Sequence, residues 1–287
     1  MLGPSRYLAD PFGIAVDGRI HILCEEFDYE TRKGLISAME LPSQQHPSKP
    51  REVLGLPIHM SYPFLLEYAG RIYCVPETAE AQETILLESE SFPDRWRRVA
   101  TLLRGVAAVD NTLFPHDGRW WLLCTDAARG PNSVLLAFYS ETPFGPWLPH
   151  AANPVKTDLS SARPAGTPFV HAGTLYRPAQ DCSETYGRRI AINEVVCLSP
   201  RAFEERTVAW VEPDPWGPYP DGIHTLSAVG GYTLIDGFRL AFVAQPFKDA
   251  VREEPGRLLG TLSDLVRQPS AGGGRGRELF SRNFFRA

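Results

Sequence analysis

The chain has 287 residues, a formal net charge of −5 and 43% hydrophobic residues. The net negative charge, with no long run of lysine or arginine, excludes nucleic acid as an expected partner. No apolar run approaches the roughly 20 residues of a membrane span, and the first residues lack the apolar stretch of a signal peptide. The five cysteines form no CxxC pair and no His/Cys cluster typical of zinc. We therefore expect a cytoplasmic protein that uses no cofactor and no metal.

A pair of short strands recurs along the chain. The first copy is ADPFGIAVDGRIHILCEE at residues 9–26, in which two apolar runs flank the turn Asp17-Gly18. An Asp-Gly pair between apolar runs is typical of a β-hairpin, because the glycine adopts the positive φ that the turn needs. The later copies lie at residues 61–77, 109–126, 165–181 and, more weakly, 223–237. A repeat of about 50 residues indicates a propeller or a solenoid.

Further strand-like runs follow the first four hairpins. These runs lie at residues 34–41, 84–90, 96–103, 133–141, 189–199 and 206–213. About four strands per repeat predict an all-β fold, a five-bladed β-propeller with about four antiparallel strands per blade. We assign the propeller to residues 1–250, and we expect the two ends of the chain to pair in one blade and so close the ring.

The C-terminal residues differ from the repeats. We predict a C-terminal extension at residues 251–287. It begins with a short helix at residues 256–267, whose leucines share one side. The glycine-rich residues 270–278 have the composition of a flexible tail.

The repeat also predicts a site. In a propeller the innermost strands converge on one axis, so residues at the starts of these strands are expected to line one pocket. At these places the chain has Asp10, His59, Tyr62, Asp110, Arg163 and His224. The second strands are predicted to end near the same funnel, at Glu25, Glu26, Glu77, Asp126, Gln180, Asp181 and Asp236. Ionisable residues at places where a packing repeat would be apolar predict a polar ligand pocket.

Several motifs resemble known propellers. The runs ADPF at 9–12, VDNTLFPHDGRWWL at 109–122 and YSETPFGPW at 139–147 resemble the arabinanase, levansucrase and invertase type of five-bladed propeller. Over most of the chain, HMSYPF, VPET, ARPAG, YRPAQDCSETYG and GIHTL resemble the N-terminal propeller domain of plant glucosamine inositolphosphorylceramide transferases and their bacterial relatives. The resemblance implies a carbohydrate ligand and a glycosyltransferase as a partner.

The same resemblance implies catalytic roles. In the hydrolase group the first-blade aspartate is the base or nucleophile, which Asp10 matches, and the third-blade aspartate tunes the acid, which Asp110 matches. The acid is usually a glutamate that opens the fourth blade, where this chain has Arg163. Because glycoside hydrolysis needs a proton donor as well as a second carboxylate, Glu26 or Glu77 would have to supply the proton from another blade.

The remaining polar residues are expected to bind the ligand. An arginine presents a fixed fork of donors that suits an anionic group, so Arg163 predicts a sugar phosphate or a uronic acid. The run RPAQDCSETYG contains many hydrogen-bonding side chains, which predicts a further contact with the ligand. The expected substrate-binding residues are His59, Tyr62, Arg163, Gln180, Asp181, Tyr186 and His224.

Two functions stay open at this point. The first is a carbohydrate-active enzyme that cleaves or transfers a glycosyl unit, which the retained Asp10 and Asp110 favour. The second is a non-catalytic module that binds a glycan or a sugar phosphate for a glycosyltransferase, which the missing fourth-blade glutamate favours. A structural scaffold is a third alternative, in which the two aspartates cap turns and Glu25, Glu26 and Glu77 are charges on the rim.

Overall fold

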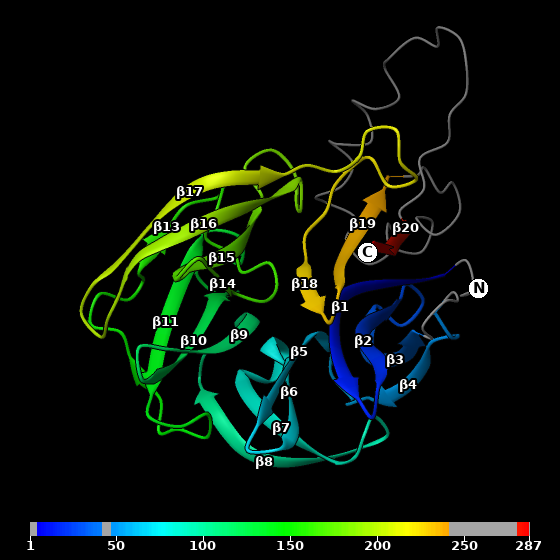
Figure 1. Ribbon diagram of the computed structural model, residues 1–287, viewed down its shortest axis with the longest axis horizontal. Coiled ribbons are helices and arrows are strands. Elements are labelled where there is room, and N and C mark those ends of the chain that lie inside the picture. Colours follow the sequence, from blue (N-terminus) through cyan, green and yellow to red (C-terminus); the bar gives the residue numbers. More distant parts are fainter. Residues whose placement is uncertain (1–4, 42–46, 241–279, 287) are drawn as a thin grey trace, which may run out of the picture.

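The computed structural model describes residues 5–41, 47–240 and 280–286. Strands dominate these residues and form sheets arranged around a common centre (Figure 1). The all-β propeller fold expected from the sequence is thus confirmed. Among the described residues, no helix is long and apolar enough to cross a membrane.

The first two sheets are four-stranded and antiparallel. The first contains β1 (Arg6–Val16), β2 (Arg19–Asp28), β3 (Lys33–Leu41) and β4 (Arg51–Leu54). The second contains β5 (Ser61–Tyr68), β6 (Arg71–Glu77), β7 (Glu83–Ser91) and β8 (Arg95–Arg104), with the 3-10 turn η1 (Ala79–Ala81) between β6 and β7. In both sheets the strands follow one another in chain order from the centre outward (Figure 1).

The other three sheets continue the ring. The third contains β9 (Ala108–His116), β10 (Arg119–Asp126), β11 (Val134–Ser140), β12 (Leu148–Pro149) and β13 (Lys156–Thr157). The fourth contains β14 (Phe169–His171), β15 (Thr174–Asp181), β16 (Arg189–Leu198) and β17 (Phe203–Val211). The last contains β18 (Leu226–Val229), β19 (Tyr232–Arg239) and β20 (Phe280–Arg286). Four sheets therefore have the four or more strands of a complete blade, and this last sheet has three described strands.

Tight hairpins join the first strand of a sheet to the second. In the turn between β1 and β2, Asp17 and Gly18 have φ values of 49° and 74°. In the turn between β9 and β10, Asp117 and Gly118 have φ values of 46° and 73°. Positive φ at both central residues is the geometry that matches the twist of the flanking strands. The Asp-Gly hairpins expected from the sequence are confirmed.

Apolar side chains fill the seams between neighbouring sheets. One cluster packs Leu23 and Ile36 of the first sheet around Met60, which precedes the second sheet. Another packs Ile22 of the first sheet against Val229 and Leu234 of the last. Successive residues of a strand point to opposite faces. Leu23 and Ile22 therefore serve the two seams on either side of β2, and the ring is a chain of sheet-to-sheet contacts.

The expected pairing of the two chain ends in one blade is wrong. Within the described residues, β1 belongs to the first sheet, and β20 pairs with β19 in the last sheet. The seam between these sheets is closed by polar contacts in addition to the apolar cluster. The hydroxyl of Ser227 donates to the carbonyl of Pro11 at 2.5 Å, and the hydroxyl of Thr225 donates to Asp10 Oδ1 at 2.6 Å. The helix predicted at 256–267 lies outside the described residues.

Replacing Ser227 by alanine should weaken this seam. The change Ser227→Ala leaves the Pro11 carbonyl without a donor in a buried place, which costs about 1–3 kcal/mol. Urea denaturation should therefore report a lower free energy of unfolding. The control Ser48→Ala removes a hydroxyl that accepts from the Glu40 N–H on the surface, and its effect should stay within about 0.5 kcal/mol. Equal effects of the two variants would contradict this account of ring closure.

Candidate ligand site on the propeller axis

Three of the inner strands contain a residue with left-handed backbone. Asp10 in β1, Tyr62 in β5 and Asp110 in β9 have φ values of 52°, 44° and 53°. Around each of them the pairing with the second strand shifts register, as in a β-bulge. Such a φ is uncommon for residues other than glycine, and strained residues of this kind cluster at functional sites. We call these three positions the kink residues.

The N–H of each kink residue donates to a carboxylate of the preceding sheet in the ring. The Asp10 N–H donates to Asp236 Oδ2 at 2.9 Å. The Tyr62 N–H donates to Asp10 Oδ2 at 3.2 Å, and the Asp110 N–H donates to Glu77 Oε2 at 3.2 Å. The kinks therefore both hold neighbouring sheets together and draw buried carboxylates to the axis.

His224 sits between two of these carboxylates. Its Nδ1 lies 2.8 Å from Asp236 Oδ2 and 3.5 Å from Asp10 Oδ1. Burial opposes the imidazolium charge, but the two carboxylates outweigh it and raise the pKa of His224 to about 9. Burial likewise opposes the charge on Asp236, and the imidazolium nevertheless holds the pKa of that carboxyl below its usual value. At neutral pH the arrangement is a charged His224–Asp236 pair beside Asp10.

Among the described residues, the same three side chains form a group that could hold a metal ion. Asp10, His224 and Asp236 each offer one ligand atom, and these atoms lie within 4.8 Å of one another. The 2.8 Å distance between His224 Nδ1 and Asp236 Oδ2 is the length of a charge-assisted hydrogen bond. The protonated His224 ring therefore accounts for this contact without a metal ion.

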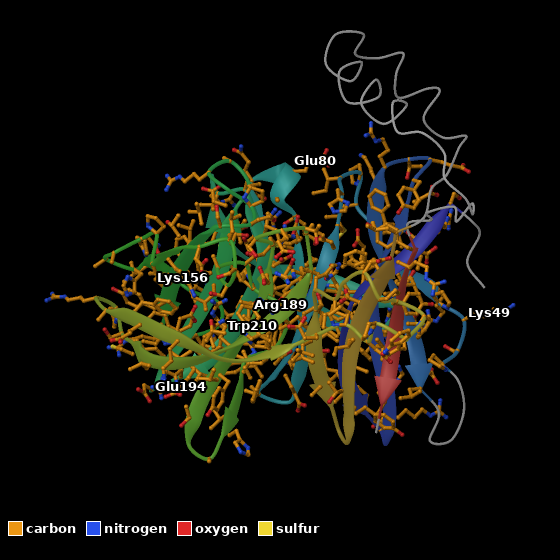
Figure 2. All side chains as sticks on the ribbon, turned by 90° about the horizontal axis from the view of Figure 1, so that it is seen from above. Lys49, Glu80, Lys156, Arg189, Glu194 and Trp210 are labelled. Atoms are coloured by element: carbon orange, nitrogen blue, oxygen red, sulfur yellow. The ribbon has the colours of Figure 1, made fainter. Side chains whose placement is uncertain are left out.

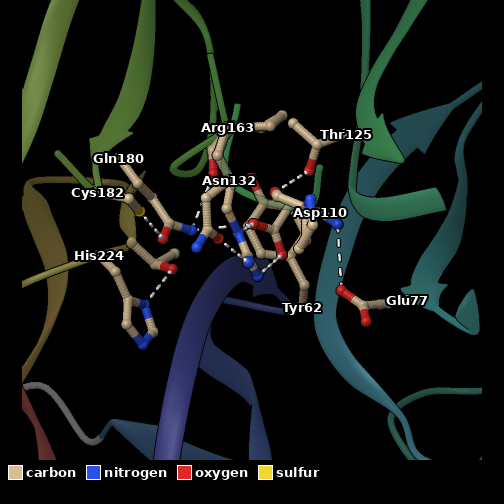
Figure 3. A network of polar contacts seen from close by, with 12 residues as sticks. Tyr62, Glu77, Asp110, Thr125, Asn132, Arg163, Gln180, Cys182 and His224 are labelled. Carbon is tan, nitrogen blue, oxygen red and sulfur yellow. Dashed lines mark hydrogen bonds and ion pairs between the residues drawn. The ribbon is translucent and has the colours of Figure 1, made fainter. Parts of the chain in front are cut away.

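The Asp110 carboxylate is held by one cation and one side-chain amide. Arg163 Nε lies 2.6 Å from Asp110 Oδ2, Arg163 Nη2 lies 3.4 Å from Oδ1, and Gln180 Nε2 donates to Oδ2 at 2.9 Å (Figure 3). Arg163 Nη1 also donates to Asn132 Oδ1 at 2.9 Å. Asp110 therefore neutralises Arg163, which the sequence suggested would hold an anionic group of the ligand. The structure brings Asp110, Arg163 and Gln180 together as expected.

Three further carboxyls keep their protons more readily than usual. Burial is the main cause in each case. It raises the pKa of Asp10 to about 6, with Asp236 and Asp110 adding to the effect and His224 opposing it. It raises the pKa of Glu77 to about 8, with the charge of Asp110 as the next cause. The pKa of Glu25 is raised well above its usual value by burial and then by Asp10 and Glu77.

Adjacent glutamates of β2 point to opposite faces of the first sheet. Glu26 accepts from Arg6 Nη1 at 3.0 Å and from the Ser37 hydroxyl at 2.7 Å. The structure therefore does not bring Glu26 to the axial carboxylates, although the sequence suggested it as a proton donor. Glu25 takes that place, with its Oε1 3.8 Å from His59 Nε2.

His59 and Tyr62 reach the site differently. His59 lies at the edge of the site, where its Nδ1 accepts from the Gly34 N–H at 2.9 Å and burial lowers the pKa of the ring. Tyr62 is fully buried, and its hydroxyl is 3.0 Å from Thr112 Oγ1 and accepts from the Gly166 N–H at 2.6 Å. Tyr62 thus ties the second sheet to the chain that leads into the fourth.

Asp181 and Tyr186 also separate. Asp181 accepts from the Ser183 N–H at 3.0 Å and from Arg189 Nε at 2.8 Å, so it secures the fourth sheet. Arg189 in turn stacks on Trp210, 3.8 Å from the ring centre (Figure 2). Tyr186 is 46% exposed, with its ring 5.3 Å from the ring of His224 and 5.0 Å from the guanidinium carbon of Arg163. Tyr186 therefore joins the axial site, and Asp181 does not.

Sequence reasoning missed Tyr7, which lies in β1 before the kink. Its ring stacks on Phe27 at 5.0 Å and contacts Tyr29 at 5.5 Å. Burial raises the pKa of Tyr7, and the next causes are the neighbouring Glu25 and Tyr186. The sequence held no sufficient signal, because counting back from the Asp17-Gly18 turn pairs Tyr7 with Asp28, and only the register shift at Asp10 places it opposite Phe27, on the same face as Glu25.

A separate cleft of about 410 Å³ lies against the first sheet. Its lining includes Arg6, Glu26, Asp28 and Lys33. Arg6 pairs with Glu26 at 3.0 Å and with Asp28 at 3.1 Å inside this cleft. The axial site is the stronger candidate, because among the described residues five buried carboxyls there face two cations. These are Asp10, Glu25, Glu77, Asp110 and Asp236 against Arg163 and His224.

Comparison with known sequences places this chain among N-terminal domains of longer proteins. Residues 1–215 match the family described as "Glucosamine inositolphosphorylceramide transferase 1, N-terminal". Glucosamine inositolphosphorylceramide transferase 1 of Oryza sativa subsp. japonica is 34% identical over 211 residues, which are 70% of this chain and 28% of that protein. The Arabidopsis thaliana protein of the same name is 33% identical over 211 residues, 70% of this chain and 27% of that protein. The chain thus spans little more than a quarter of these relatives.

Solved structures of glycoside hydrolases share the fold. A family 117 glycoside hydrolase of the marine bacterium Zobellia galactanivorans has a TM-score of 0.60 at 12% identity, covering 85% of this chain and 82% of that chain. The family 43 endo-arabinanase of Bacillus licheniformis has a TM-score of 0.54 at 12% identity, covering 83% of this chain and 90% of that chain. At such identities the likeness shows the propeller fold alone.

The raised carboxyl pKa values should make the protein less stable as the pH rises. The folded-state pKa of Glu77 is raised from 4.5 to about 8, so its stabilising contribution is present below pH 4.5 and is lost as the pH rises through 8. One extra proton bound by the folded state corresponds to about 1.4 kcal/mol per pH unit. Urea denaturation between pH 5 and pH 8 should show a falling free energy of unfolding.

The variant Glu77→Gln should flatten this slope, because the amide oxygen still accepts from the Asp110 N–H without titrating. The exposed Glu90→Gln is the matched control and should keep the wild-type slope. A wild-type slope in Glu77→Gln would show that Glu77 titrates normally.

Proposed function

Because the chain belongs to the family of glucosamine inositolphosphorylceramide transferase 1 N-terminal domains, we propose that it cleaves or transfers a glycosyl unit in the axial site. The observation that carries the proposal is the separation of carboxyl pKa values in one buried cluster. Asp10, at about 6, is ionised at neutral pH, whereas Glu77, at about 8, holds its proton, and so does Glu25. Environments that push carboxyl pKa values apart are how one site provides an acid and a base together.

Glycosyl chemistry assigns these groups complementary tasks. An ionised carboxylate removes a proton from the attacking water or attacks the sugar itself, and a protonated one donates to the leaving oxygen. Asp10 suits the first task, and Glu25 and Glu77 are the two candidates for the second. Asp110, whose charge helps to raise the pKa of Glu77, suits the role of keeping that proton in place.

The charges of the site favour a neutral glycosyl ligand over a phosphorylated one. Arg163 is paired in two-pronged fashion with Asp110, and His224 is paired with Asp236. No cation is left over in the described part of the site for a phosphate, and the remaining carboxyls would repel it. The exposed ring of Tyr186 offers an apolar surface for the face of a sugar.

A binding module that serves a glycosyltransferase is the second candidate. Arg163 stands where the hydrolase group has its glutamate, and the relatives named for transferase activity are more than three times as long as the matched region. In this case the same axial site would bind a glycan without turning it over, and a transferase domain would be the partner.

We further propose that the propeller has five blades and that the protein is cytoplasmic. The three-stranded sheet acts as the fifth blade, since Val229 and Leu234 pack on Ile22 of the first sheet as blades of a ring do. A reducing, cytoplasmic location is supported by the cysteines, all five of which are free.

Asp10→Asn should separate the two candidates. If the site is catalytic, a panel of 4-nitrophenyl glycosides will contain a substrate whose kcat falls by about 10²–10⁴-fold in this variant. Nitrophenol release and thermal melting should be measured together. Asp117→Asn is the matched control, because asparagine also suits the exposed hairpin turn and should leave kcat unchanged. Binding of a sugar by the wild type without any turnover would instead establish the binding module.

The rate should depend on pH in a bell shape. Asp10 must be ionised, so kcat/KM should rise through a pKa of about 6. The donor must be protonated, so kcat/KM should fall at high pH: at about 8 if Glu77 is the donor, and well above the usual pKa of a glutamate if the donor is Glu25. A profile that is flat from pH 5 to pH 9 would contradict the assignment of these carboxyls.

A further inference from the structure

Glu25 and Glu77 occupy equivalent places in the first and second sheets. Glu25 in β2 pairs with Ala9, the residue before the kink residue Asp10. Glu77 in β6 pairs with Ser61, the residue before the kink residue Tyr62. Both glutamates lie near the axial end of the second strand of their sheet. Each points toward the following sheet, Glu77 to Asp110 and Glu25 to His59, which precedes β5. By analogy, Glu25 should accept a hydrogen bond from the next kink residue, as Glu77 does.

The hydrogen bond expected for Glu25 is accepted by another residue, Asp10. Glu77 accepts from the Asp110 N–H, but the Tyr62 N–H donates to Asp10 Oδ2 and not to Glu25. No described residue forms a hydrogen bond with the Glu25 carboxyl, and its nearest charged partner is His59 Nε2 at 3.8 Å. The Glu25 side chain is nevertheless only 7% exposed. The small exposed part of this side chain leaves the carboxyl oxygens open to a bound molecule.

The chain leaves room for this carboxyl. A Cβ atom on Gly34 would lie 2.5 Å from Glu25 Oε1 and 2.4 Å from the carbonyl oxygen of Met60. Any side chain at Gly34 would therefore displace Glu25 or the backbone beside it. Glycine at this position allows the carboxyl to sit where it does.

The charges around Glu25 keep its proton in place. Its pKa is raised by burial and then by Asp10, Glu77, Asp110 and Asp236, all of which are acidic groups. Glu25 is thus a carboxylic acid with an O–H to donate. Tyr7, on the same face of the first sheet, adds an aromatic wall beside it.

We propose that Glu25 is the proton donor of the axial site, in place of the fourth-blade glutamate that Arg163 replaces. The assignment rests on the proposed glycosyl chemistry. The Glu25 proton moves to the glycosidic oxygen as the bond between that oxygen and the anomeric carbon breaks, and the bonding electrons stay on the oxygen of the departing alcohol. A water molecule bonds to the anomeric carbon and gives its proton to Asp10. Proton exchange with solvent then returns both carboxyls to their starting states.

Leaving-group dependence tests this role directly. The probes are the phenyl and the 2,4-dinitrophenyl glycosides of the sugar that the panel identifies. Phenol needs a proton to leave, so Glu25→Gln should lower kcat on the phenyl glycoside by about 10²–10⁴-fold. Dinitrophenolate leaves without a proton, so the loss on that substrate should be less than tenfold. The fall of kcat/KM at high pH should also disappear.

Further variants keep the outcome unambiguous. Glu67→Gln, on the exposed face of β5, is the matched control and should behave as wild type. Glu25→Asp retains an acid and should keep the fall at high pH while losing part of the rate on the phenyl glycoside. The assignment of Glu25 fails if Glu25→Gln lowers kcat equally on the phenyl and the 2,4-dinitrophenyl glycoside, or lowers kcat on neither. If Asp10→Asn abolishes turnover in the same experiments, the proposed function nevertheless stands. If the wild type turns over no glycoside, both fail.

Discussion

The structure depends on hydrogen bonds from strained backbone to buried carboxylates. At Asp10, Tyr62 and Asp110 the inner strand takes a left-handed φ, and each N–H leaves its own sheet to reach a carboxylate of the preceding sheet. A buried carboxylate is costly without donors, and a buried N–H is costly without an acceptor. The N–H and the carboxyl therefore stabilise each other. As a result, the axis both connects neighbouring sheets and gathers the carboxyls of the site.

The same arrangement sets the chemistry of the site. In the part of the site that the structure describes, two cations face the five carboxyls, and each cation is already paired, His224 with Asp236 and Arg163 with Asp110. The carboxyls without a cation partner either keep their protons or have a pKa close to neutral pH. One of them, Glu25, has no hydrogen bond from the described residues. Under the proposed function, these carboxyls are the ones that would act as acid and base.

Arg163 illustrates how a single residue can mislead. In the sequence an arginine in place of a glutamate suggests an anionic ligand. In the fold its guanidinium faces Asp110, 53 residues earlier in the chain, and Tyr186 covers it. In the structure its role is to compensate the buried charge of Asp110, and the charges that remain are the reason why a neutral sugar is the ligand we propose.

The sequence by itself determined the repeat, the Asp-Gly hairpins and the polar starts of the inner strands, because these are local patterns of turn chemistry and alternation. It also placed Asp10, Asp110, Gln180 and His224 near one axis. Only the tertiary structure decided which of Glu25 and Glu26 faces that axis, since adjacent strand residues point to opposite faces and the bulge at Asp10 shifts the register. It also decided the partners of Arg163 and Asp181, because such pairings join side chains that meet only after the sheets have packed.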